Sequence, residues 1–283
     1  MKWKIVTDSG ASIRFDHALP DQIGFEVVPL VINIGTQVFV DDSIDKVPAL
    51  MEAMESSKLG SASACPAPDA YAKTFMDADQ VICFTISSNL SGSFNSATLA
   101  KEMVLEDHPE KQIHIFDSRS AGSEMDLLIR QAIDIIQTGK DFDQVIQALN
   151  SFHETSDIVF MLESVDNLVK NGRLSKVVGG MIGLLGIRLV AKRTQEGTIE
   201  IIHKSKGTKR AIKTMVDELM KLGYQGGRLE ISYCLNLENA NDFKELVLSK
   251  FPSADIQVRP ASGLCSYYAQ RGGLLIGMTN EPA

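Results

Sequence analysis

The sequence has few features that would place the chain in a membrane, at a metal ion or in an oxidising compartment. No apolar run among its 283 residues reaches the ~18 residues that a membrane-spanning helix needs. The longest candidate, residues 177–190, is interrupted by four glycines and Arg188, and the first residues contain no apolar stretch of the secretory type. The four cysteines lie far apart without a CxxC pair, which favours buried or incidental thiols. We therefore expect a soluble, cytoplasmic protein without a metal site.

The motifs of several common enzyme classes are also missing. The sequence contains no GxSxG nucleophile elbow, no P-loop and no GxGxxG. None of the five histidines lies in a glycine-rich or strand-end motif, where it could serve as the base for a serine nucleophile. The 28 Lys and Arg against 36 Asp and Glu give a net charge of −8, which disfavours nucleic acid as a partner. Hydrolases, kinases and dehydrogenases would each lack their usual machinery here.

What the sequence does contain is a regular alternation of apolar strands and amphipathic helices. In the first half, strands are expected at 4–7, 81–86 and 112–117, two β-rich runs at 27–40, and helices at 68–78, 94–107, 124–138 and 142–154. This order predicts a doubly wound, mostly parallel sheet. A second series contains a strand at 157–162, a short helix ending at 171, a hairpin at 187–203, helices at 209–222 and 239–251, and strands at 229–234, 255–258 and 274–278. The fold class is therefore α/β, with two domains expected at 1–157 and 158–283, the second smaller.

Hydroxyl groups gather where an expected strand passes into a helix, in the stretch ISSNLSGSFNSA at 86–97. The start of a helix offers free backbone N–H groups and the positive end of the helix dipole, so Ser91-Gly92-Ser93 suits a carboxylate, phosphate or sulfate. For a single turn of this kind, ordinary N-capping is the better explanation. Similar stretches at Thr7–Ser9, Ser61–Ser63 and Asp117–Ser120, taken as further strand ends, favour a binding site.

A second informative stretch is NLVKNGRLSKVVGGMIGLLGI at 167–187, where Arg173 follows Gly172. Its glycines allow the close approach of a slender apolar object, and Met181 can adapt its shape to one. A glycine-rich core helix packed on the sheet is the alternative, and it is favoured when this stretch is considered alone.

Taken together, these residues resemble the DegV family of bacterial fatty-acid-binding proteins along nearly the whole chain. The motifs that carry the resemblance are Thr7-Asp8-Ser9, Pro29-Leu30 followed by Asp41-Asp42, the stretch 63–68, the stretch 86–97, Asp117-Ser118 and the stretch 171–175. The resemblance implies a long-chain fatty acid buried between two α/β domains. It implies no cofactor and no catalysis by this chain, which would carry the fatty acid to a separate kinase subunit that makes acyl-phosphate.

The resemblance also implies roles for particular residues. The carboxylate would lie on Ser91, Gly92 and Ser93, with a further donor from Ser63 at the position of the family's threonine. Arg173 joins this group, and Thr7 and Ser118 are weaker candidates. The acyl tail would run along a tunnel whose expected lining is Ile86, Met181 and Leu184.

The chain departs from the family at its C-terminal motif. The stretch that corresponds to the family's His-Thr-Gly-Pro-Gly lies here at residues 267–273, with Ala269 at the histidine position. Tyr268, Gln270 or Arg271 could replace the histidine, or the ligand could differ. A basic stretch at 204–210 contains Lys206 and Lys209, which are expected either to dock the kinase subunit or to belong to a solvated loop. Besides the carrier, two functions stay open: a binder or sensor of another anionic lipid or small carboxylate, and a serine-dependent acyl hydrolase.

Overall fold

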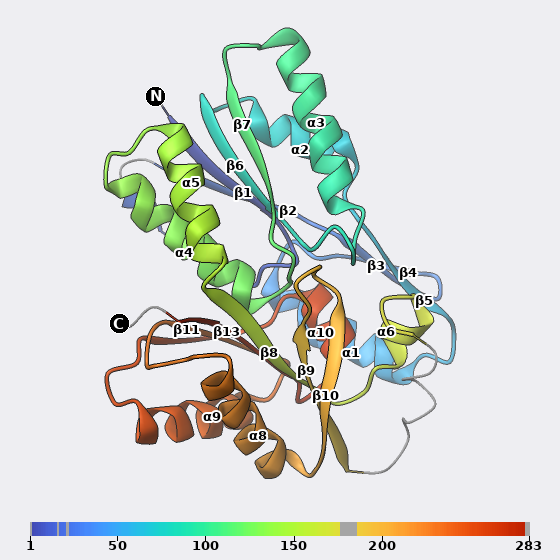
Figure 1. Cartoon of the computed structure of the whole chain (residues 1–283). Coiled ribbons are helices and arrows are strands. Elements are labelled where there is room, and N and C mark those ends of the chain that lie inside the picture. The colour runs from blue at the N-terminus through green and yellow to red at the C-terminus, as the bar shows by residue number, and fades with distance from the viewer. Residues whose placement is uncertain (1, 16, 21–22, 176–185, 281–283) are drawn as a thin grey trace.

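The computed structural model describes residues 2–15, 17–20, 23–175 and 186–280 (Figure 1). The first half contains a parallel four-stranded sheet in the order β2-β1-β6-β7. Its strands are β1 (Trp3–Asp8), β2 (Gly24–Val28), β6 (Gln80–Thr85) and β7 (Gln112–Asp117). The expected doubly wound parallel sheet is therefore present in this half of the chain.

Helices cover both faces of this sheet. Successive side chains of a strand point to opposite faces, and here apolar side chains point to both. Ile5 and Ile82 face α4 (Ser123–Gln137) and α5 (Phe142–His153), while Val6 and Val81 face α2 (Pro68–Phe75) and α3 (Ser93–Asp107). Figure 1 shows the two helix pairs on opposite sides of the strands. All carboxyl ends of these parallel strands consequently point to one edge, toward the second half of the chain.

The second half forms a six-stranded sheet in the order β10-β9-β8-β13-β11-β12. Its strands are β8 (Ser156–Leu162), β9 (Ile187–Arg193), β10 (Ile199–Lys206), β11 (Leu229–Tyr233), β12 (Ile256–Pro260) and β13 (Leu274–Thr279). Only β11 and β12 pair in parallel; the other pairs are antiparallel. Helices α8 (Thr208–Lys221) and α9 (Leu237–Lys250) pack on one face of the sheet. The opposite face, with Phe160 and Leu275, is left for contacts with the first half.

A small antiparallel sheet, β4-β3-β5, lies beside the junction of the two halves (Figure 1). It consists of β3 (Val31–Ile34), β4 (Gln37–Val40) and β5 (Ser61–Ala64), and it is accompanied by a 3-10 turn (Ile44–Lys46) and the helices α1 (Val47–Ser56), α6 (Asp166–Lys170) and α10 (Gly263–Ala269). The expectation that 61–63 ends a strand is wrong, because these residues lie inside β5. Alternation along β5 turns Ser61 and Ser63 to the same side, where they meet Tyr267 and Tyr268 of α10.

The tip of the β9–β10 hairpin reaches back to the first sheet. The Ser87 hydroxyl donates to the carbonyl of Gly197 at 2.7 Å, and the Asn89 side-chain amide donates to the carbonyl of Glu196 at 2.6 Å. The tip therefore closes over the loop that follows β6. None of the helices in the described ranges has the length and apolar character needed to cross a membrane.

Candidate functional site

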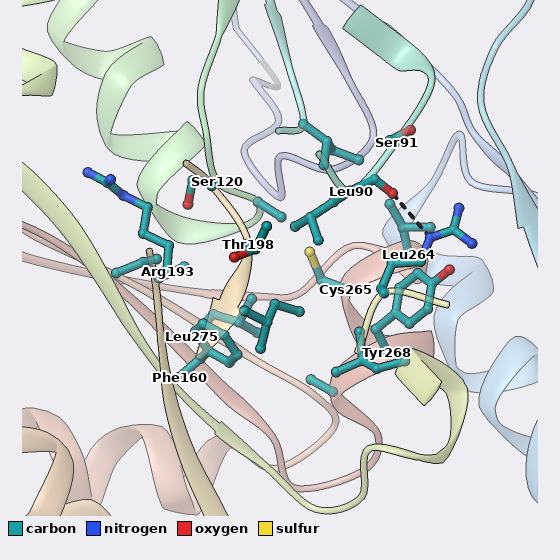
Figure 2. Close-up of a pocket in the computed structure, with 18 of the residues that line it drawn as sticks. Leu90, Ser91, Ser120, Phe160, Arg193, Thr198, Leu264, Cys265, Tyr268 and Leu275 are labelled. Atoms are coloured by element: carbon teal, nitrogen blue, oxygen red, sulfur yellow. Dashed lines mark hydrogen bonds between the residues drawn. The ribbon is translucent and has the colours of Figure 1, made fainter. Parts of the chain in front are cut away.

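An apolar pocket lies between the parallel sheet and the free face of the six-stranded sheet (Figure 2). It encloses about 800 Å³ of space not occupied by atoms, part of it open to solvent. Most of its walls are aliphatic or aromatic, from Ile86, Leu90, Ile158, Phe160, Leu162, Leu168, Leu264 and Leu275. A pocket with walls of this character suits an apolar ligand that is oriented by a few polar groups.

Polar side chains converge on one end of the pocket. The Tyr268 and Ser63 hydroxyls are 2.7 Å apart, and both residues line the wall. The Arg173 guanidinium lies beside them and donates through Nε to the Leu90 carbonyl at 3.1 Å, as the dashed line in Figure 2 shows. Burial raises the pKa of Tyr268, while the Ser63 hydrogen bond and the Arg173 charge oppose that rise. The tyrosine is thus a hydrogen-bond donor at neutral pH.

The charges that line the pocket are all positive. Arg119, Arg173 and Arg193 are part of its wall, and no aspartate or glutamate appears among the described lining residues. Arg119 pairs with Glu154 at 2.8 Å, and Arg193 pairs with buried Glu124 at 2.8 Å. Within the described ranges, Arg173 has no acidic partner and donates only to carbonyl groups. A buried or half-buried cation favours an anion beside it, so the Arg173 end is where a carboxylate fits best.

The serine-rich turn contributes one wall residue and a layer behind it. Ser91 lines the pocket, and its Oγ accepts from the Ser93 backbone N–H at 3.2 Å and lies 3.0 Å from the Ser93 Oγ. Ser91 thus satisfies the first N–H group of α3, but the N-cap residue is Gly92 and no side chain caps the helix. Ser93 has no exposed surface and is not part of the pocket wall, and its hydroxyl acts to lower the pKa of Asp8. Ser93 can therefore act on a ligand only through Ser91.

Asp8 is the acid of this second layer. It has no exposed surface, and its carboxyl oxygens accept from the backbone N–H groups of Gly10 and Ile86, each at 2.9 Å. Burial raises the pKa of Asp8 to about 7, although these two hydrogen bonds and that from Ser93 act in the opposite direction. Asp8 therefore fixes the loops that follow β1 and β6.

The other residues predicted at the head group also support the loops. Gly92 is adjacent to the thiol of Cys65, whose sulfur would lie 3.0 Å from a Cβ at this position. Thr7 and Ser118 are fully buried, and their hydroxyls donate to the carbonyls of Asp8 and Ser120. None of these three residues lines the pocket.

The residues that stand at the position of the family's C-terminal motif line two different pockets. Tyr268 and Ala269 line the apolar pocket, whereas Gln270 and Arg271 line a separate polar pocket and Arg271 pairs with Glu55 at 2.8 Å. Among the three candidates to replace the family's histidine, the structure brings only Tyr268 to Ser63 and Arg173. The predicted tunnel residue Ile86 lines the pocket, while Met181 and Leu184 lie outside the described residues.

Sequence reasoning did not assign the polar residues farther along the pocket to the site. Ser120, Thr198, Arg119 and Arg193 all contribute to its wall, and two of them come from the β9–β10 hairpin. The Asp117–Ser120 stretch was predicted as a strand-end motif, but no pattern indicated that a hairpin eighty residues later would meet it. That contact depends on how the two sheets are placed in space.

Comparison with known proteins gives a consistent result along the whole chain. The family model described as "Uncharacterised protein, DegV family" matches residues 2–279. A DegV domain-containing protein of Streptococcus pneumoniae is 45% identical over 277 residues, which cover 98% of this chain and 99% of that protein.

Two solved structures show the same fold. One is the Streptococcus pneumoniae fatty acid kinase (Fak) B3 protein loaded with linoleic acid, which is 44% identical, has a TM-score of 0.96 and covers 99% of this chain and 100% of its own. The other is a DegV family protein from Eubacterium eligens loaded with heptadecanoic acid, which is 32% identical, has a TM-score of 0.94 and likewise covers 99% and 100%. The chain belongs to the DegV family.

Proposed function

We propose that this protein binds a long-chain fatty acid, with the carboxylate at the Arg173 end of the pocket and the tail along its apolar walls. The observation that carries the proposal is the Arg173 guanidinium, which lines an apolar pocket without an acidic partner among the described residues. Ser63, Ser91 and Tyr268 supply hydroxyl donors beside it, and Gly92 and Ser93 support Ser91. The fatty acids in the two similar structures support the same ligand class.

The energetics favour a ligand of this kind. A sixteen-carbon acid has fourteen methylenes, and at ~0.8 kcal/mol for each buried CH₂ the transfer free energy reaches ~11 kcal/mol before the costs of binding. An unpaired buried carboxylate would cancel much of this gain. Charge-assisted hydrogen bonds from Arg173 and the neighbouring hydroxyls offset that cost.

The first test is mass spectrometry of an organic extract of the protein purified after bacterial expression. We expect close to one fatty acid per chain. A different anionic lipid or a small carboxylate in the extract would replace the proposal with the binder or sensor interpretation. Turnover of activated acyl esters that disappears in Ser91→Ala would instead support a hydrolase.

The head-group assignment is tested by Tyr268→Phe, which removes a hydroxyl and keeps the ring. We expect the affinity for a fatty acid to fall by ~1–3 kcal/mol, as for the loss of a donor to a buried charge. Ser63→Ala and Ser91→Ala should weaken binding by a similar amount, and Ser93→Ala should do so through Ser91. The methyl ester of the same acid is the control, because its affinity should hardly change. Equal losses for acid and ester would contradict the assignment.

We further propose that the protein is a cytoplasmic carrier that presents its fatty acid to a separate kinase, as the name of the similar B3 protein suggests. Lys206 at the end of β10 and Lys209 at the start of α8 are exposed and form our candidate docking site. Reversing both charges should lower kinase-dependent phosphorylation without changing fatty acid binding. Reversing Lys140 and Lys250, which are also exposed, is the matched control. Unchanged phosphorylation in the first variant would eliminate this docking site.

A further inference from the structure

The Ser120 side chain is a buried polar group on the pocket wall with nothing to bond. Ser120 is only 2% exposed, and its hydroxyl oxygen has no hydrogen-bond partner among the described residues. The backbone of the same residue is fully engaged: its N–H donates to the Ser118 hydroxyl, and its carbonyl accepts from the Ser87 N–H and the Ser118 hydroxyl. The loop that holds Ser120 is therefore fixed, while the hydroxyl is available.

The direction of this hydroxyl is informative. Ser120 lines the pocket, and Figure 2 shows its hydroxyl on the side of Thr198 and Arg193, away from Ser91 and Tyr268. The pocket wall continues there through apolar Ala121, Ile158, Phe160 and Leu275. Ser120 consequently faces the part of the pocket that would hold the hydrocarbon chain.

The nearby polar groups are already paired with one another. The Thr198 hydroxyl is 2.9 Å from the Thr194 hydroxyl. Arg193 is held by both carboxylate oxygens of Glu124 and by the Ser156 carbonyl. A buried hydroxyl that cannot reach these groups stays unpaired unless the ligand supplies a partner, and unpaired buried donors are unfavourable.

We propose that the pocket prefers fatty acids that carry an oxygen within the chain, as hydroxy or keto acids do, and that Ser120 hydrogen-bonds that oxygen. The proposal rests on the proposed function, because the carboxylate at Arg173 sets how far along the chain the oxygen must lie. A hydroxyl both donates and accepts, so either kind of oxygen can pair with it. A plain fatty acid still binds, but it leaves the Ser120 hydroxyl unpaired.

Competition between lipids tests this directly. Delipidated protein is mixed with equal amounts of stearic acid and its positional hydroxy isomers, and the bound lipids are extracted and quantified by mass spectrometry. We expect one interior isomer to be enriched roughly tenfold over stearic acid, the factor typical of one net hydrogen bond. The 2- and 3-hydroxy acids should show no enrichment, because their oxygen lies beside the carboxylate.

The matched variant is Ser120→Ala, which should still bind stearic acid and should lose the enrichment. Because the hydroxyl makes no bond in the protein, its removal should leave Tm unchanged or higher. Thr198→Val, at a polar neighbour already paired, should keep the enrichment. No enriched isomer in the wild type, or the same enrichment in Ser120→Ala, would overturn the proposal. Failure of stearic acid and every isomer to bind would instead overturn the proposed function, and this inference with it.

Discussion

At the scale of single residues, Asp8 is a buried acid whose titration falls near physiological pH. Its pKa is raised to about 7 by burial, so the folded protein holds this proton more tightly than the unfolded chain does. The stability that Asp8 contributes is therefore fully present below its unfolded pKa and is lost as pH rises through about 7.

We expect the free energy of unfolding to fall by roughly 1 kcal/mol from Asp8 alone between pH 6.5 and 8. Asp8→Asn should lack this loss, although its stability is lower throughout because Asn cannot accept from both Gly10 and Ile86. Urea unfolding of both proteins across this range gives the comparison. Parallel stability curves for the two proteins would contradict the assignment of Asp8.

The titration of His153 changes the free energy of unfolding with pH in the opposite direction to that of Asp8. His153 is present in both proteins of that comparison. Burial, followed by the charges of Arg119 and Arg193, lowers the pKa of His153 to about 4. The folded state thus keeps the imidazole neutral, and its contribution is lost as pH falls from the unfolded value toward 4. The contribution of His153 therefore cancels when the free energies of unfolding of wild type and Asp8→Asn are subtracted.

The sequence predicted some of the site residues and could not rank others. Ser63, Ser91 and Arg173 could be chosen from their motifs, and the structure brings them to one wall. Tyr268, Gln270 and Arg271 were equivalent in the sequence, because the end of α10 decides among them. Gln270 has a φ of 61°, which turns the chain after the helix and sends Gln270 and Arg271 to the other pocket.

At the scale of elements, strand–helix alternation was sufficient to predict most of the helices and strands. It missed β5, whose sequence SASA contains no β-branched or aromatic residue. This segment is a strand because it pairs with β3. The pairing depends on the tertiary structure, so no local sequence pattern could predict it. The helix α1 was also missed, and with it the support that it gives to α10.

The β9–β10 hairpin depends on a glycine at its tip. A Cβ on Gly197 would lie 2.4 Å from the Ser87 Oγ and 2.8 Å from the Arg119 backbone, and the φ of +79° is itself unfavourable for other residues. We expect Gly197→Ala to lower the free energy of unfolding by about 2–4 kcal/mol through left-handed backbone strain and overpacking combined.

Gly139→Ala is the matched control for this substitution. Gly139 has a similar φ of +75° but no neighbour within 4 Å of the added methyl group. Its substitution should cost only about 1 kcal/mol, the backbone part alone. If denaturant unfolding gave the same cost for both glycines, the tip would not be packed as described.

At the scale of the whole molecule, we propose residues 1–157 and 158–283 as two domains joined by buried charges. Glu124 of α4 has no exposed surface and bonds Arg193 of β9 through both carboxylate oxygens. Arg193 also donates to the Ser156 carbonyl. These bonds connect α4, which packs on the first sheet, to β9 of the second sheet.

Arg193→Met should lower the free energy of unfolding by about 3–5 kcal/mol, because it leaves Glu124 buried without its cation. Arg271→Met, which removes an exposed pair with Glu55, should cost no more than about 1 kcal/mol. Adding Glu124→Gln to Arg193→Met should recover part of the stability. Thermal unfolding of the three variants separates these outcomes, and a small effect of Arg193→Met would mean that water reaches Glu124.

The guanidinium of Arg173, which has no acidic partner among the described residues, has a consequence for the lipid class that we propose as ligand. Membrane glycerolipids have the same hydrocarbon tails as free fatty acids, but their carboxyl groups are esterified and bring no negative charge to the guanidinium. The tails alone cannot distinguish the two classes, whereas the charge can. A pocket of this kind would therefore select free fatty acids over esterified lipids that carry the same tails.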